Sequence, residues 1–325
     1  MLETEYVAQI ARLKVPPVLN TGGTLYSEAA LSRPGIEENE DEADRWFNKA
    51  VETWTKEAEK GNADAQLQLY HCYITGRGDY RKDVTKAIKW LTISAENGNV
   101  QAQYYLAQSY TVGMDVPKNE KEAFKWYYRA AEQGHADAQY YLALCYYNGD
   151  GIEKNLPEAV KWSRKAAEQK DGMGSMAQFF LGGCYEFGNG VKQDFAEAAK
   201  WYQKSAERGN CHGQLALGYL YGSGRGVKQD FIEAEKWLRK AAEQGVPEAQ
   251  LELWKYYYGG RIGIKKDYQE AKKWIRKAAE QDCGEAQYLL GSMYLQERNE
   301  TEALVWIIKA ADNGNAAAIK LLNSL

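Results

Sequence analysis

The stretch GQLALGYLYGSGRGVKQDFIEAEKWLRKAAEQG, residues 213–245, decides the fold of this 325-residue chain. Gln214, Leu217 and Tyr221 stand three and four residues apart, a spacing that places them on one stripe of a helix. Two glycines then interrupt the helical pattern, and a second helical segment follows and ends at another glycine. The stretch therefore predicts two helices, A and B, joined by a glycine-bearing turn.

The same pattern occurs seven times along the chain. Each unit has a Gln, preceded by Ala in six units and by Gly in one, with Leu three residues later and Tyr seven residues later. The glutamines are Gln66, Gln103, Gln139, Gln178, Gln214, Gln250 and Gln287. A Trp follows in every unit: Trp90, Trp126, Trp162, Trp201, Trp237, Trp274 and Trp306. A chain of this length would ordinarily be expected to hold roughly two domains, but such repetition indicates a repeat architecture instead.

Capping signals mark the ends of each helix B. Asp194, Asp230 and Asp267 stand three residues before a Glu, a layout typical of a capping box. Helix B is expected to end at a glycine such as Gly245, which can take the left-handed conformation. A single hairpin cannot bury both of its faces, whereas stacked copies can. We therefore predict an all-α fold, an α-solenoid of seven helix-turn-helix repeats of about 36 residues.

Composition and charge exclude several classes of protein. Lys and Arg number 41 and Asp and Glu 45, so the formal charge is −4, and the basic patch of a nucleic-acid binder is not expected. No apolar run approaches the ~18 residues of a membrane span, and the N-terminus does not read as a signal peptide. Five cysteines favour reduced thiols and a cytoplasmic location, or a periplasmic or secreted one if an upstream signal peptide was removed.

The combined pattern resembles Sel1-like repeats, which are related to the tetratricopeptide repeat. The resemblance covers about residues 41–325 and implies a right-handed superhelix with a concave binding surface and a role as scaffold or adaptor. We expect two parts: residues 1–41 as a partly ordered N-terminal arm, and residues 42–325 as the solenoid, ending in a capping helix at 315–325. Residues 170–176 predict a longer, looser junction, because Lys170 replaces the usual glycine and three residues are added.

Positions that vary between repeats are free to serve a partner. On helix A these lie two, five and nine residues after the Gln and share one face, which should line the concave side. Large apolar and aromatic residues gather there in the second to fifth units: Tyr105, Tyr141, Leu144, Phe180, Phe187 and Tyr219. Exposed, they would form an anchor for a protein or peptide. Two alternatives stay open: these rings are buried in the solenoid core, or the N-terminal arm fills the groove.

Other signals receive structural interpretations. Cys72, Cys145 and Cys184 share one slot of helix A and are expected to be buried and unbridged, because equivalent residues of stacked helices lie 8–10 Å apart. Six of the Trp residues follow a Lys, with a Glu three residues before it in most units, a pattern typical of a solvated helix face. The repeat Trp residues are expected to be core anchors.

The leading hypothesis is a non-catalytic protein–protein interaction scaffold that is a monomer or a weak oligomer, without a catalytic site, metal or cofactor. The alternative is a cell-envelope enzyme of penicillin-binding or β-lactamase type. Such an enzyme would want Ser-x-x-Lys, and no serine here has a Lys three residues on.

Overall fold

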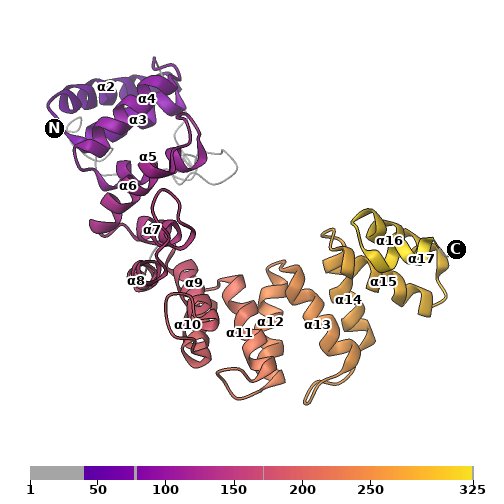
Figure 1. The fold of residues 1–325 in the computed structure, drawn as a ribbon. Helices are drawn as coiled ribbons and strands as arrows, with labels where there is room; N and C mark the ends of the chain where they lie inside the picture. Colours follow the sequence, from indigo (N-terminus) through magenta and orange to yellow (C-terminus); the bar gives the residue numbers. More distant parts are fainter. Residues whose placement is uncertain (1–39, 77–78, 171, 324–325) are drawn as a thin grey trace. The chain divides into compact units, whose positions relative to one another are not determined.

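The structure is a computed structural model that describes residues 40–76, 79–170 and 172–323. These residues form sixteen α-helices joined by short turns (Figure 1). The helices are α2 (Glu40–Glu59), α3 (Ala63–Thr75), α4 (Val84–Glu96), α5 (Val100–Val112), α6 (Glu120–Glu132), α7 (Ala136–Asn148), α8 (Leu156–Ala167), α9 (Gly174–Phe187), α10 (Phe195–Glu207), α11 (Cys211–Ser223), α12 (Phe231–Glu243), α13 (Pro247–Gly259), α14 (Tyr268–Ala279), α15 (Gly284–Gln296), α16 (Glu300–Asp312) and α17 (Ala316–Leu322). Odd-numbered helices are helices A and even-numbered helices are helices B, so the prediction of an all-α hairpin repeat is confirmed.

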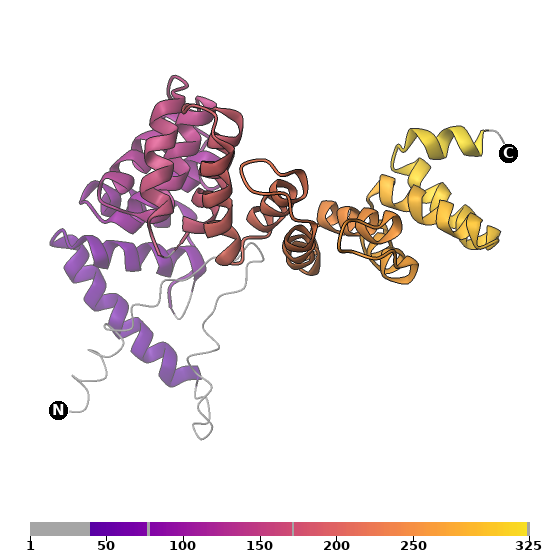
Figure 2. The ribbon, with the colours of Figure 1, turned by 90° about the horizontal axis from the view of Figure 1, so that it is seen from below.

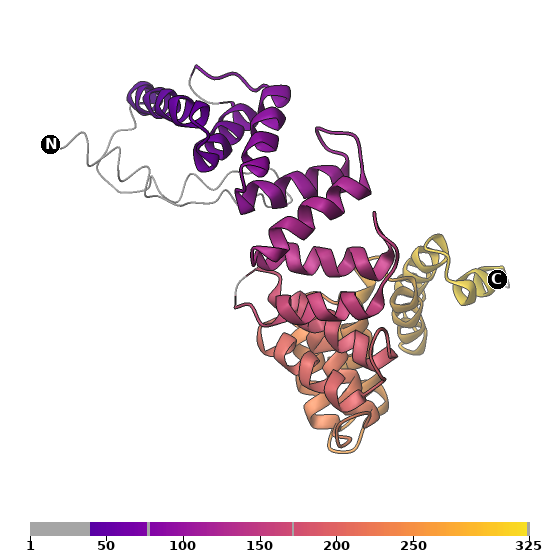
Figure 3. The same cartoon turned by 60° about the vertical axis from the view of Figure 1, so that its left-hand side comes forward.

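The chain divides after Trp126, inside α6, into two units, residues 1–126 and 127–325. From α2 to α5 and from α7 to α17, each helix packs against the next one along the chain, as the successive pairs in Figure 3 illustrate. Helix α17 packs against α16 and ends the second unit. The predicted N-terminal arm, residues 1–41, falls almost entirely on residues 1–39, which lie outside the described residues. The alternative that this arm fills the groove concerns the same residues.

Half of the predicted capping box is present. Asp230 Oδ1 accepts hydrogen bonds from the backbone N–H groups of Ile232 and Glu233, at 2.9 and 3.1 Å. The Glu233 carboxylate, however, pairs with Lys236 at 3.1 Å and does not return to the cap. The N–H of Asp230 donates instead to the carbonyl of Tyr221, at 3.0 Å. The end of helix A thus supplies the partner that the second half of a capping box would have supplied.

The repeated Gln joins each helix A to the helix B before it. In all seven units its Nε2 donates to a carbonyl oxygen in the last turn of the preceding helix B, over 2.9–3.2 Å. Each Gln is buried. In Gln214 the Oε1 also accepts from Gln244 of the following helix B, at 2.7 Å. Because a buried polar group needs a partner, this side chain sets the register between consecutive helices.

The second glycine of the Gly-x-Gly turn lets one repeat touch the backbone of the repeat before it. Gly226 has a φ of +72°, and a Cβ at this position would overlap the carbonyl of Phe195, the first residue of α10. Gly190 makes the same approach to Leu156 at the start of α8. The turn of each such repeat therefore lies directly on the N-terminus of the previous helix B.

The core of each unit consists of buried clusters rich in Trp, Leu and Ala side chains. Six of the seven repeat Trp residues are buried, and Trp90 is partly buried, which confirms their role as core anchors. In five repeats a Lys three positions after the Trp lies over its ring, for example Lys204 at 3.9 Å from the centroid of Trp201. The expected Glu–Lys pairs are present on the exposed faces of helices B, as between Glu197 and Lys200 at 2.6 Å.

The inserted junction after α8 is longer, as expected, but the part of it that the structure describes is tied down. Arg208 donates to the carbonyls of Gln169 and Lys170, at 3.0 and 2.6 Å. The N–H of Met173 donates to Asp137, at 2.7 Å. The described residues of this junction therefore have specific hydrogen-bond partners, which come from Asp137 of α7 and from Arg208, the residue after α10.

Candidate protein-interaction surface

The three variable positions of helix A differ in how far they are exposed. Residues two positions after the Gln are mostly half-buried, and those five positions after it are also mostly half-buried. All seven residues nine positions after the Gln are exposed. The variable face is therefore half-buried near the contacts between helices and exposed at the position nine residues after the Gln.

Three of the predicted anchors lie on the half-buried part of this variable face, in the second unit. Tyr141, Leu144 and Phe180 are half-buried and pack against the core cluster around Leu181. The ring of Tyr141 stacks on Tyr127, with centroids 5.3 Å apart. Phe180 meets Tyr147 edge to face, with centroids 5.1 Å apart. These rings therefore serve the packing of neighbouring repeats and offer only one side to solvent.

The two remaining anchors of the second unit are accessible. Phe187, in the last turn of α9, is 69% exposed, and Tyr219 on α11 is 38% exposed. Burial of the rest of Tyr219, together with the nearby carboxylates of Glu252 and Glu248, raises the pKa of its phenol to about 12. The hydroxyl consequently stays protonated at neutral pH and remains a hydrogen-bond donor.

Tyr105 belongs to the first unit and is half-buried there. Its ring lies 6.2 Å from that of Tyr70 and 5.9 Å from that of His71, between centroids. Burial lowers the pKa of His71 to about 4, so this imidazole is neutral at pH 7. The group on α3 and α5 is thus a packed aromatic cluster with one half-buried, neutral histidine.

Helices A form the closer-spaced row in the middle of the second unit. Helix α9 contacts both α7 and α11, whereas α8, α10 and α12 make no comparable contact with one another among the described residues. The row with the shorter spacing lies on the inner side of a curved stack. Tyr141, Leu144, Phe180, Phe187 and Tyr219 all belong to this row.

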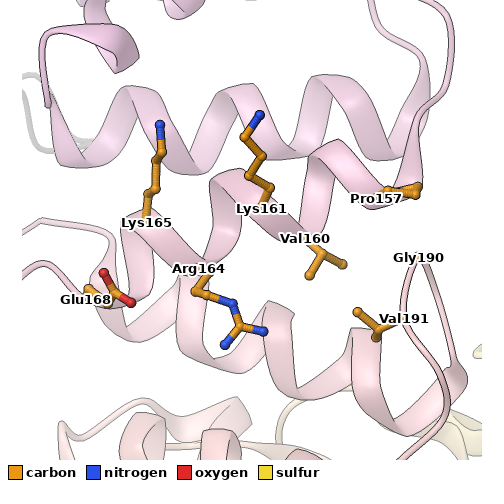
Figure 4. A pocket seen from close by; sticks show the side chains of 8 residues that line it. All are labelled: Pro157, Val160, Lys161, Arg164, Lys165, Glu168, Gly190 and Val191. Carbon is orange, nitrogen blue, oxygen red and sulfur yellow. The ribbon is translucent and has the colours of Figure 1, made fainter.

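A shallow pocket of ≈ 430 Å³ lies on the other row, between α8 and the turn that follows α9. Figure 4 shows Lys161 and Lys165 pointing to one side of α8 and Arg164 to the other, with Val160 and Val191 facing each other. The three cations already have partners. Lys161 pairs with Glu158 at 3.0 Å, Lys165 lies over Trp162, and Arg164 donates to the Tyr185 hydroxyl at 2.7 Å. The pocket therefore reads as part of the solvated face of helix B.

Potential metal ligands do not gather in the described ranges. No three His, Cys, Asp or Glu side chains there are placed to hold a metal ion. Cys72, Cys145 and Cys184 are buried and form no disulfide, as expected. Burial raises the pKa of both Cys72 and Cys184 to about 12, so neither is a thiolate at neutral pH. Among the described helices, none has the length and apolarity needed to cross a bilayer.

Comparison with known families bears directly on the hairpin pattern. The Sel1 repeat profile matches residues 25–52, 63–99, 100–135, 136–171, 175–210, 211–246, 247–283 and 284–315, most of the chain. The chain belongs to the Sel1 repeat family. The chain has eight matched repeats, one more than the seven that we expected. The prediction missed the first match, at residues 25–52, because this segment lacks the Ala-Gln and Gly-x-Gly motifs that were counted. That match includes the first part of α2.

Two solved structures resemble this Sel1 repeat protein closely. One is c5321, a protective antigen present in uropathogenic Escherichia coli strains and displaying an SLR fold, with 36% identity and a TM-score of 0.76 over 82% of this chain. The chain spans 57% of the length of that protein. The other is a Sel1 repeat protein from Oxalobacter formigenes, with 31% identity and a TM-score of 0.73, covering 86% of this chain and 81% of the other. A search of curated proteins gave no match.

Proposed function

We propose that this Sel1 repeat protein is a non-catalytic scaffold that binds a protein or an extended peptide along its helices A. The observation that carries the proposal is the exposure of Phe187 and Tyr219 on neighbouring helices of the more closely spaced row. Contiguous exposed apolar patches often mark interaction sites, and Tyr and Phe are effective interface anchors. The half-buried Tyr141, Leu144 and Phe180 would form the floor between them.

The half-buried and the exposed residues of this surface differ in how well they can test the proposal. Tyr105, Tyr141 and Phe180 contact other aromatic rings, so their replacement by Ala would remove packing as well as any binding. Phe187 and Tyr219 can be truncated with less loss of buried area. We therefore expect F187A/Y219A to weaken partner binding while leaving the unfolding transition within about 1 kcal/mol of wild type.

The experiment is selection of a displayed random-peptide library on the full chain, followed by affinity measurement of the selected peptides. Peptides bound along helices A should lose at least tenfold in affinity for F187A/Y219A, since anchor residues typically contribute 1–2 kcal/mol or more. The matched control is I232A/I262A, which truncates two residues that are 58% and 82% exposed on another part of the second unit. Equal binding to both double variants and wild type would refute the proposed surface.

A further inference from the structure

Helix α16 differs from the earlier helices B beside its tryptophan. In six repeats a Lys precedes the repeat Trp: Lys89, Lys125, Lys161, Lys200, Lys236 and Lys273. In α16 the residue before Trp306 is Val305, and the residue two positions after it is Ile308. Leu304, Val305 and Ile308 are 44%, 45% and 43% exposed and stand one and three residues apart. They therefore form one apolar stripe along the outside of the helix.

This stripe continues the interface between repeats. The residue two positions after the Trp contacts the Trp of the next repeat in three pairs within the second unit. These are Tyr128 with Trp162, Arg164 with Trp201 and Arg239 with Trp274, over 6.1, 5.8 and 5.7 Å to the ring centroid. Ile308 occupies this position in α16, the last helix B of the described residues. Its side chain thus lies where a further helix B would pack.

Helix α17 leaves the stripe open. It packs against α16, but the exposed fractions of Leu304, Val305 and Ile308 are those that remain with α17 in place. Figure 2 shows this short helix at the C-terminal end of the second unit. Its own Ile319 is 41% exposed. An exposed apolar stripe of this kind indicates a contact surface.

The charges beside the stripe fit a second copy of the same helix in the opposite direction. Glu302 and Lys309 are both exposed and lie seven residues apart, two helical turns, on the same flank of α16. The ammonium of Lys309 lies over the Trp306 ring, 4.6 Å from its centroid, which holds it on that flank. The midpoint between Glu302 and Lys309 falls beside Val305. A twofold axis at that point would set each Glu302 opposite the Lys309 of the other copy.

We propose that α16 pairs antiparallel with α16 of a second copy of this chain, forming a symmetric dimer through Leu304, Val305 and Ile308. The opposed helix dipoles and the two Glu302–Lys309 pairs fix the direction. The apolar stripe offers a few hundred Å² per copy, less than the ~800 Å² per partner of a standard stable complex. The dimer is therefore weak, with a dissociation constant in the micromolar range or above.

Sedimentation velocity of the full chain between about 5 and 300 μM tests the apolar contact. The weight-average sedimentation coefficient of wild type should rise across this range. V305K/I308R installs residue types that other helices B carry at these positions and should stay monomeric, with an unchanged circular dichroism melt. I232K/I262R, which makes the same exchanges at exposed isoleucines of another surface, should associate like wild type. A wild type that stays monomeric throughout, or a V305K/I308R variant that associates equally well, overturns the proposal.

Charge reversal tests the direction. E302K and K309E should each weaken dimerisation by about 2- to 30-fold or more, since two exposed ion pairs are lost per dimer and each contributes a factor of about 1.4 to 5. The double variant E302K/K309E restores opposite charges across the axis and should associate within about threefold of wild type. Weak association of the double variant, with its helix content retained, would overturn the antiparallel pairing.

Discussion

Replacing Gly226 with Ala should destabilise the second unit more than any other glycine-to-alanine change in a turn of comparable backbone geometry. The φ of +72° is unfavourable for any L-residue and costs about 1–2 kcal/mol. In addition, the new Cβ would overlap the Phe195 carbonyl, where ordinary contact requires about 3.5 Å. Backbone atoms cannot rotate away, so the turn must lift off α10. Overpacking of this kind costs about 1–3 kcal/mol, for a total of about 2–5 kcal/mol.

Gly245→Ala is the matched control. Gly245 has a φ of +91°, but a Cβ there meets nothing within 4 Å. This variant should show only the conformational cost of about 1 kcal/mol. The difference in urea midpoint between the two variants, followed by circular dichroism at 222 nm, isolates the contact between repeats. Hydrogen exchange should locate the extra loss at the start of α10 and in the turn before α12. If G226A is no less stable than G245A, the backbone contact does not hold the repeats together.

Two further predictions concern pH and backbone strain. Burial lowers the pKa of His71 to about 4 against an unfolded value near 6.5, so the unfolded state takes up the proton first. In denaturant titrations of wild type, the contribution of His71 to the free energy of unfolding is fully present above pH 6.5 and decreases toward pH 4, by about 2 kcal/mol at pH 5. The H71Q variant should lack this part of the decrease. An equal decrease in wild type and H71Q would refute the assignment to His71. Arg298, just after α15, has a φ of +58°, a conformation that favours glycine. R298G should therefore raise the urea midpoint by the equivalent of about 0.5–1 kcal/mol, and an unchanged or lower midpoint would contradict the strain.

The repeat itself was readable from the sequence because each of its parts depends on local chemistry. Helix periodicity, an Asp cap such as Asp230 and a terminal glycine such as Gly245 act over a few residues, and all are present where the pattern predicted them. The buried Trp residues follow from the same periodicity. The count of repeats was missed by one, because the first repeat keeps the helical pattern while lacking the motifs that define the others.

The exposure of the residues on the candidate surface depends on how neighbouring helices pack, and no local sequence pattern specifies that packing. The sequence placed Tyr141, Phe180 and Phe187 on one variable face, but it left open whether that face is exposed or buried in the core. Only the tertiary structure separates the packed rings of Tyr141 and Phe180 from the open ring of Phe187, because burial depends on how closely the next helix approaches. The apolar face of α16 has the same origin. Val305 is visible in the sequence, yet its exposure follows from the absence of a further helix B beside it in the described structure.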